Sequence, residues 1–83
     1  MEKLLMNENF CKNLKRIRKK SGLTQEQTVI KLQLLGSPIS RSTYSLIEMG
    51  RGNIFISDLV GLKQIFGVSY DEFFEGVTVQ REN

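Results

Sequence analysis

The sequence predicts an all-α fold, a five-helix orthogonal bundle, on three observations. Apolar residues recur three or four positions apart, a residue with a capping side chain precedes each run, and a glycine follows it. Such signals mark where helices begin and end. With 83 residues and no linker or internal repeat, we expect one domain over residues 1–83. Its core should span about 10–76, with a flexible N-terminal arm and a C-terminal tail.

The helix boundaries follow from the caps and the stops. The expected N-caps share a side chain that accepts a hydrogen bond from a first-turn N–H group: Asn7, Thr24, Ser40, Ser57 and Ser69. The expected stops are glycines, which adopt the left-handed conformation readily: Gly22, Gly36, Gly50, Gly67 and Gly76. Gln27 and Glu72 each stand three residues after a cap, where they complete capping boxes.

The apolar stripes predict the core. Its expected members are Phe10, Leu14, Ile17, Val29, Leu32, Tyr44, Ile47, Leu59, Leu62, Ile65 and Phe66, with Ile30 or Leu35 at its edges. The second helix should run to about Leu35, because Gly36 and Pro38 cannot continue it. Pro38-Ile39 should then form an extended connector to the third helix. The tail, 77–83, alternates weakly and is expected to fray or to pair as a strand with a second copy.

Composition limits the function classes. The chain has no histidine and one cysteine, so we expect no metal site, no cofactor and no enzymatic activity. No apolar run approaches the roughly 18 residues of a membrane span. The N-terminus lacks a signal core, so a cytoplasmic protein without a membrane partner is expected. The sequence shows no evident site for a small-molecule ligand.

Charge is distributed unevenly along the chain. Residues 1–56 hold ten Lys or Arg against four acids, whereas residues 57–83 hold two against five. Half of all the basic residues lie in one helix: Lys12, Lys15, Arg16, Lys19, Lys20 and Arg18. A run of this kind is often just a solvated helix face. Beside a pair of capped helices, it favours a polyanionic partner.

The order of these signals resembles the phage-repressor and Cro type of helix-turn-helix domain, the XRE family of bacterial regulators. The matching segments are 12–20, Ser21-Gly22-Leu23-Thr24-Gln25-Glu26, Ser40-Arg41-Ser42-Thr43, Ile47-Glu48-Met49-Gly50-Arg51 and 62–74. The resemblance implies a lambda-repressor-like DNA-binding domain. The chain departs from it in the lengthened connector between the second and third helices, residues 33–39. It also has Thr28 and Val29 where the family usually has leucine and a small residue.

The resemblance also implies site residues. The helix at about 40–49 would read the major groove of double-stranded DNA. Its base-contacting positions would be Arg41, Ser42, Ser45 and Leu46. The phosphate-contacting positions would be Gln25, Ser40, Thr43, Arg51 and Asn53. Leu46 could instead make a dimer or core contact. Arg18 and Glu48 would form a structural pair.

The leading expectation is a sequence-specific transcriptional regulator, a repressor, that binds as a homodimer. The expected dimer surface is the acidic, aromatic C-terminal part: Tyr70, Phe73, Phe74, Val77 and Val79. Alternatively, these side chains complete the hydrophobic core, which is expected more for Phe73 than for Phe74. The alternative function is a protein-interaction module, such as an antitoxin or accessory factor, that uses the same scaffold.

Overall fold

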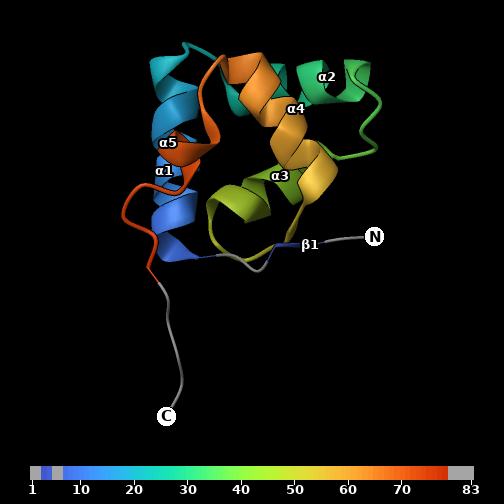
Figure 1. Ribbon diagram of the computed structural model, residues 1–83. Coiled ribbons are helices and arrows are strands. Elements are labelled where there is room, and N and C mark those ends of the chain that lie inside the picture. The colour runs from blue at the N-terminus through green and yellow to red at the C-terminus, as the bar shows by residue number, and fades with distance from the viewer. Residues whose placement is uncertain (1–2, 5–6, 79–83) are drawn as a thin grey trace.

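Five helices account for nearly all the regular structure in the computed structural model, which describes residues 3–4 and 7–78 (Figure 1). They are α1 (Glu8–Lys20), α2 (Gln25–Leu34), α3 (Arg41–Glu48), α4 (Ile56–Phe66) and α5 (Tyr70–Phe73). Two short strands, β1 (Lys3–Leu4) and β2 (Ile54–Phe55), form an antiparallel pair. The prediction of an all-α fold with five helices is confirmed.

The first three helices begin at the residues that the caps predicted. The Asn7 side chain accepts the first-turn N–H groups of α1. Thr24 and Gln27 form the capping box of α2, with hydrogen bonds of 3.1 and 2.9 Å. The Ser40 hydroxyl accepts the Thr43 N–H of α3 at 3.2 Å. Local hydrogen bonding therefore determines where the two helices of the candidate interface start.

The fourth helix does not begin as predicted. Ser57 was the expected N-cap, but α4 starts at Ile56 with Phe55 in the N-cap position and no side-chain cap. The cause is β2, in which Phe55 pairs with Lys3 and holds the backbone extended up to the helix. The predicted flexible arm thus contributes a strand. At the other end of the chain, α5 ends at Phe73 and not near Gly76.

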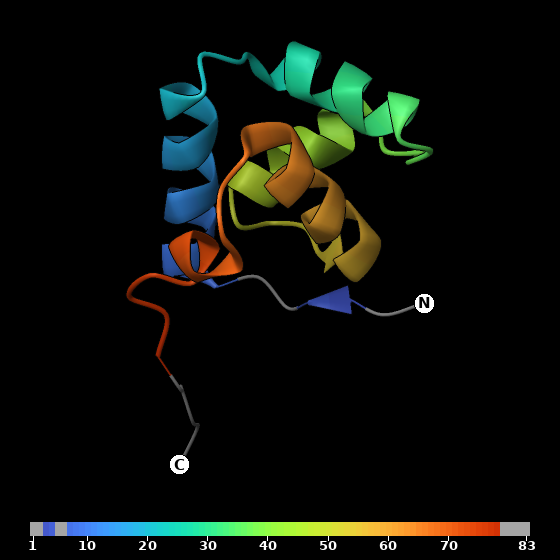
Figure 2. The same cartoon turned by 45° about the horizontal axis from the view of Figure 1, so that its top comes forward.

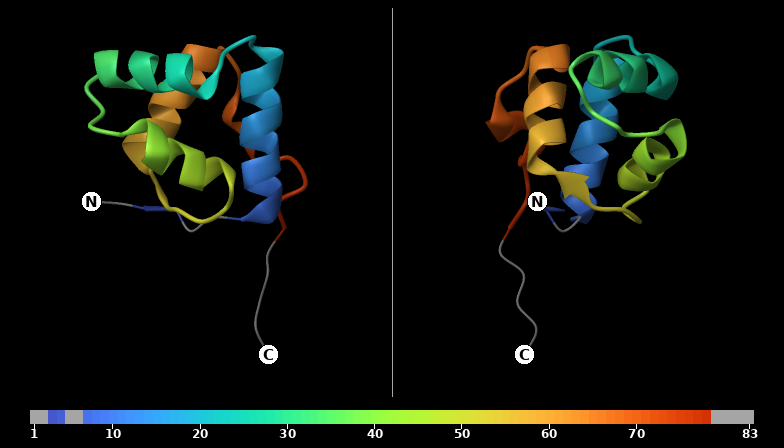
Figure 3. Two further views of the ribbon diagram at one scale, coloured as in Figure 1. Left: turned by 180° about the vertical axis from the view of Figure 1, so that it is seen from behind. Right: turned by 90° about the vertical axis from the view of Figure 1, so that its right-hand side faces the viewer.

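The helices pack crosswise around one core. Figure 2 shows α2 lying across the top of the molecule, where it contacts α4, while α3 packs against α1 and α2. The side view of Figure 3 places α3 and α5 on opposite sides of α1. The buried core contains Phe10, Leu14, Ile17, Val29, Leu32, Ile39, Tyr44, Ile47, Ile54, Leu59, Leu62, Phe66 and Phe73. The predicted inward residues are all in this set except Ile65, which is half-buried. The expectation of Ile30 or Leu35 at the edge of the core is wrong, because both are about half exposed.

Helix α2 ends near Leu35, as predicted, and the connector residues 37–40 form neither helix nor strand. Leu35 is the C-cap of α2, and Gly36 has φ of +100°. The Ser37 N–H then donates to the Leu32 carbonyl at 3.1 Å, which closes the helix end. The Gln33 side chain donates to the Ile39 carbonyl at 2.9 Å and ties the connector back to α2. No helix among the described residues is both long and apolar enough to cross a bilayer.

Candidate nucleic-acid interface

The four predicted base-contacting residues lie on one face of α3. At positions i, i+1, i+4 and i+5 they share an arc of the helix. Arg41 and Ser42 are exposed, Leu46 is 43% exposed and Ser45 is half-buried. The opposite face of α3 carries Tyr44, which is fully buried in the core. Leu46 is therefore not a core residue.

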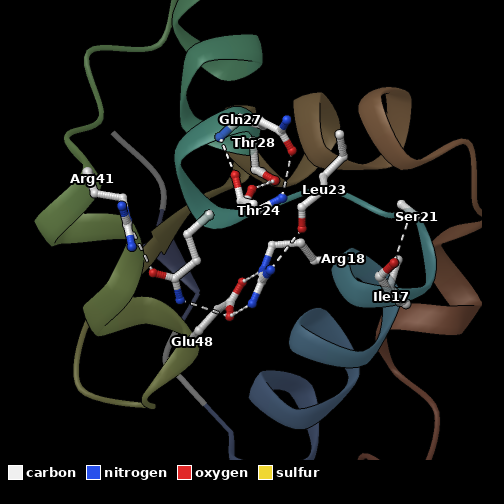
Figure 4. A network of polar contacts seen from close by, with 10 residues as sticks. Ile17, Arg18, Ser21, Leu23, Thr24, Gln27, Thr28, Arg41 and Glu48 are labelled. Atoms are coloured by element: carbon white, nitrogen blue, oxygen red, sulfur yellow. Dashed lines mark hydrogen bonds and ion pairs between the residues drawn. The ribbon is translucent and has the colours of Figure 1, made fainter.

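Gln25 joins the start of α2 to both ends of α3. Its side-chain carbonyl accepts from Arg41 Nε at 3.3 Å, and its side-chain amide donates to Glu48 Oε1 at 3.1 Å. Figure 4 shows Arg41 and Glu48 on α3 with the start of α2 between them. The sequence resemblance had implied only a phosphate contact for Gln25. In the structure, this side chain also orients the first residue of α3.

A buried ion pair fixes α3 against α1. Arg18 Nε donates to Glu48 Oε2 at 2.6 Å, and Arg18 Nη2 donates to Oε1 at 3.0 Å. The side chains are 9% and 2% exposed, respectively. Arg18 Nη1 also donates to the Leu23 carbonyl at 2.9 Å, at the turn before α2 (Figure 4). The expected structural pair is thus present, with the bidentate geometry that makes such pairs strong.

Burial and hydrogen bonding act in opposite directions on the Glu48 carboxylate. Burial raises its pKa, but the hydrogen bonds from Arg18 and Gln25 outweigh this, so the pKa lies below its usual value. Burial is also the main cause that raises the pKa of the nearby Tyr44 phenol. Among the described residues, the Tyr44 hydroxyl has no hydrogen-bond partner of ordinary geometry, although the charges of Glu48 and Arg18 act on it.

The other predicted phosphate contacts lie at the two ends of α3. At its start, Ser40 and Thr43 are exposed, and their hydroxyls are 2.9 Å apart. Arg51 and Asn53 are exposed in the loop that follows α3, where the Arg51 N–H donates to the Leu46 carbonyl at 2.9 Å. Within residues 7–78, neither side chain contacts the other candidates through a hydrogen bond. Asn53 nevertheless borders the same cleft as Ser40 and Thr43, so the fold brings it near the start of α3.

The exposed basic residues of α1 form one stripe along the helix. Lys15, Arg16, Lys19 and Lys20 stand at positions i, i+1, i+4 and i+5, which share an arc of a helix. On one side of this stripe, Lys12 and Lys15 border a cleft that also touches Gly50, at the end of α3. On the other side, Arg16 is 3.7 Å from the Glu75 carboxylate in the C-terminal part.

The proposed C-terminal dimer surface is only partly exposed. Tyr70 and Phe74 are 38% and 40% exposed, whereas Phe73 is fully buried and closes the core. The Phe74 ring also packs on Phe10, with ring centroids 5.5 Å apart. Of the two readings of Phe73, core closure, which was favoured for it over Phe74, is the correct one, so Phe73 is not part of a dimer surface. Val77 is half-buried against the core, and Val79 with the rest of 79–83 lies outside the described residues.

Comparison with known proteins found no matching family model, no matching curated protein and no matching solved structure.

Proposed function

We propose that this protein is a sequence-specific, duplex-DNA-binding transcriptional regulator built on a lambda-repressor-like bundle. In this proposal α2 and α3 form the helix-turn-helix, and the first half of α3 enters the major groove. A major groove admits a helix whose exposed side chains are polar or small. Arg41, Ser42 and Ser45 meet this description.

The observation that carries the proposal is the presentation of Arg41. Its Nε is held by Gln25, and within residues 7–78 the guanidinium makes no other hydrogen bond. The two terminal nitrogens are therefore free to donate to the O6 and N7 atoms of guanine. A bidentate contact of this kind discriminates by roughly 1–3 kcal/mol against the wrong base. A tethered arginine also loses less side-chain entropy on binding.

The charges around α3 support the same proposal. Glu48 is the acid of α3, and a free carboxylate there would repel DNA phosphates. Its side chain is 2% exposed and is paired with Arg18, so its charge is both covered and neutralised. The first turn of α3 contains no acid. Its exposed N–H groups favour a phosphate by their dipole.

Useful affinity requires two copies, because one small domain reads only a few base pairs. A two-fold dimer would place the two α3 helices about 34 Å apart on a near-palindromic site. The exposed Tyr70 and Phe74 lie across α1 from α3, on the acidic part of the chain. Dimerisation there would leave both α3 helices accessible. Repression follows from occupying an operator without any further domain.

Selection from random duplexes followed by sequencing tests the proposal. We expect an enriched palindrome whose half-sites are one helical turn apart. Arg41→Ala should then weaken the base preference at one base pair in each half-site. The matched control Lys31→Ala, which removes an exposed cation of α2, should leave the base preference unchanged. Selection that enriches no sequence would refute the proposal. An equal loss of affinity for all sequences in Arg41→Ala would show that Arg41 contacts phosphate.

A second function is favoured by exposed apolar residues on α2. Ile30 and Leu34 lie one turn apart on its outer face and are 49% and 82% exposed. Apolar surface of this kind is typical of protein contacts. An antitoxin or accessory factor would use it to bind a partner protein. A stable one-to-one complex with a second protein, together with no enriched duplex, would support this function over the first.

A further inference from the structure

The exposed face of α3 changes character along the helix. Its first half carries the polar residues Arg41, Ser42 and Ser45. Its second half carries Leu46 and Met49, which are 43% and 58% exposed. Met49 is the C-cap of α3 and keeps helical backbone angles. Because it follows Ser45 by four residues and Leu46 by three, its side chain lies on the same face as the predicted base contacts, although it was not among them.

Neighbouring residues hold this apolar pair at the surface. The Leu46 carbonyl accepts the Arg51 N–H at 2.9 Å, so the loop after α3 is tied to the backbone beside it. Gly52 packs close by, and a Cβ there would lie 3.5 Å from the Leu46 Cβ. The Ser45 hydroxyl is 4.0 Å from the Met49 sulfur. The backbone of Leu46 is thus fixed, while the flexible thioether of Met49 can follow the shape of a partner.

The charges around the apolar pair favour a polyanionic partner over a second protein. Lys12 and Lys15 border the same cleft as Met49. Glu8 borders that cleft too, but its carboxylate is 3.2 Å from the Lys12 ammonium. The Glu48 side chain is 2% exposed and lies in its ion pair. An apolar surface beside cations, with the neighbouring acids paired, suits DNA bases that are flanked by phosphates.

We propose that Leu46 and Met49 recognise the C5-methyl groups of pyrimidines, so that each DNA half-site contains thymine near the guanine assigned to Arg41. In the major groove the thymine methyl group is an apolar feature of the base edge, and side chains that cannot donate a hydrogen bond identify thymine through it. A helix rise of about 1.5 Å per residue places Leu46 and Met49 about 7.5 and 12 Å along α3 from Arg41. At about 3.4 Å per base pair, the thymine lies within about four base pairs of the guanine. This specificity rests on the DNA-binding function proposed above.

Removing methyl groups from the DNA tests this specificity with the unmodified chain. Each thymine of the duplex selected from random sequences is replaced in turn by deoxyuridine, which lacks only the C5-methyl group. Burial of one methyl group changes affinity about fourfold, so we expect a loss of that size at one or two thymines in each half-site. At the same positions, 5-methylcytosine should bind more tightly than cytosine.

The outcomes separate this specificity from DNA binding itself. A selected palindrome that tolerates deoxyuridine at every thymine would overturn the proposal and leave the DNA-binding function standing. A palindrome without thymine within about four base pairs of the guanine would do the same. Selection that enriches no sequence would overturn both.

Variants assign the methyl contacts to the two side chains. Leu46→Ala and Met49→Ala should each abolish the sensitivity to deoxyuridine at the thymine that the side chain contacts. The matched control Leu34→Ala, which truncates an 82% exposed leucine of α2, should keep the sensitivity at every position. Unchanged sensitivity in both α3 variants would overturn the proposal. If the same variants also self-associate more weakly without DNA in sedimentation equilibrium, the pair belongs to a protein contact instead.

Discussion

Removing Glu48 should destabilise the fold by an amount that its burial allows us to estimate. Glu48→Ala leaves the Arg18 guanidinium, whose side chain is 9% exposed, without its carboxylate partner. Breaking a buried ion pair from one side costs about 3–5 kcal/mol. An 83-residue domain has a free energy of unfolding of about 4–12 kcal/mol, at roughly 0.05–0.15 kcal/mol per residue. The variant should therefore lose a large share of its stability.

Urea denaturation followed by circular dichroism measures this loss, provided that the m-value is unchanged. The matched control is Glu8→Ala, which removes an ion pair with Lys12 whose side chains are 82% and 70% exposed. Exposed pairs of this spacing contribute little, about 0.3–0.5 kcal/mol. Replacing both Arg18 and Glu48 by apolar residues should restore much of the stability. A loss below about 1 kcal/mol in Glu48→Ala would refute the assigned role of the pair.

Three further outcomes are expected. Folding lowers the pKa of Glu48, so the ionised carboxylate stabilises the fold fully above its usual pKa of 4.5, and this stabilisation is lost as pH falls through the lower pKa of the folded state. The difference in unfolding free energy between the parent chain and Glu48→Gln should therefore shrink over that pH range. A difference that stays constant with pH would contradict this prediction. Tyr44→Phe removes a buried hydroxyl without a partner and should raise the unfolding free energy by about 1 kcal/mol, whereas a loss would reveal a hydrogen bond there. Lys15 lies beside the end of α3, so Lys15→Gln should reduce the slope of log affinity for DNA against log salt concentration by about one. Arg16 lies toward Glu75, so Arg16→Gln should leave this slope unchanged. Slopes in both variants that equal the slope of the parent chain would place Lys15 and Arg16 outside the interface.

Local signals in the sequence were sufficient for most of the helices. Asn7, Thr24 and Ser40 were identified as N-caps because capping depends on residues only two or three positions away. The glycines after α1 and α2 were found for the same reason, since a positive φ is a property of one residue. Helical spacing located the core, because one face of each helix must be buried.

Signals of this kind failed where distant segments meet. Ser57 looked like an N-cap, but the pairing of Lys3–Leu4 with Ile54–Phe55 starts α4 earlier. A two-residue strand has no alternation that could reveal it. For Phe73 and Phe74, by contrast, the sequence had favoured Phe73 as the core residue, and the packing of α5 on α1 agrees: Phe73 is fully buried and Phe74 is 40% exposed.

The sequence by itself determined the helices, their caps and the apolar faces that form the core, because each depends on residues within a few positions of one another. Only the tertiary structure decided how the candidate site is assembled. Gln25 meets Glu48 across 23 residues, a contact that the sequence had not indicated, whereas the pair of Arg18 and Glu48, 30 residues apart, was implied only by the resemblance. Contacts of this kind arise from the packing of whole helices, for which the spacing of residues along the chain carries no signal.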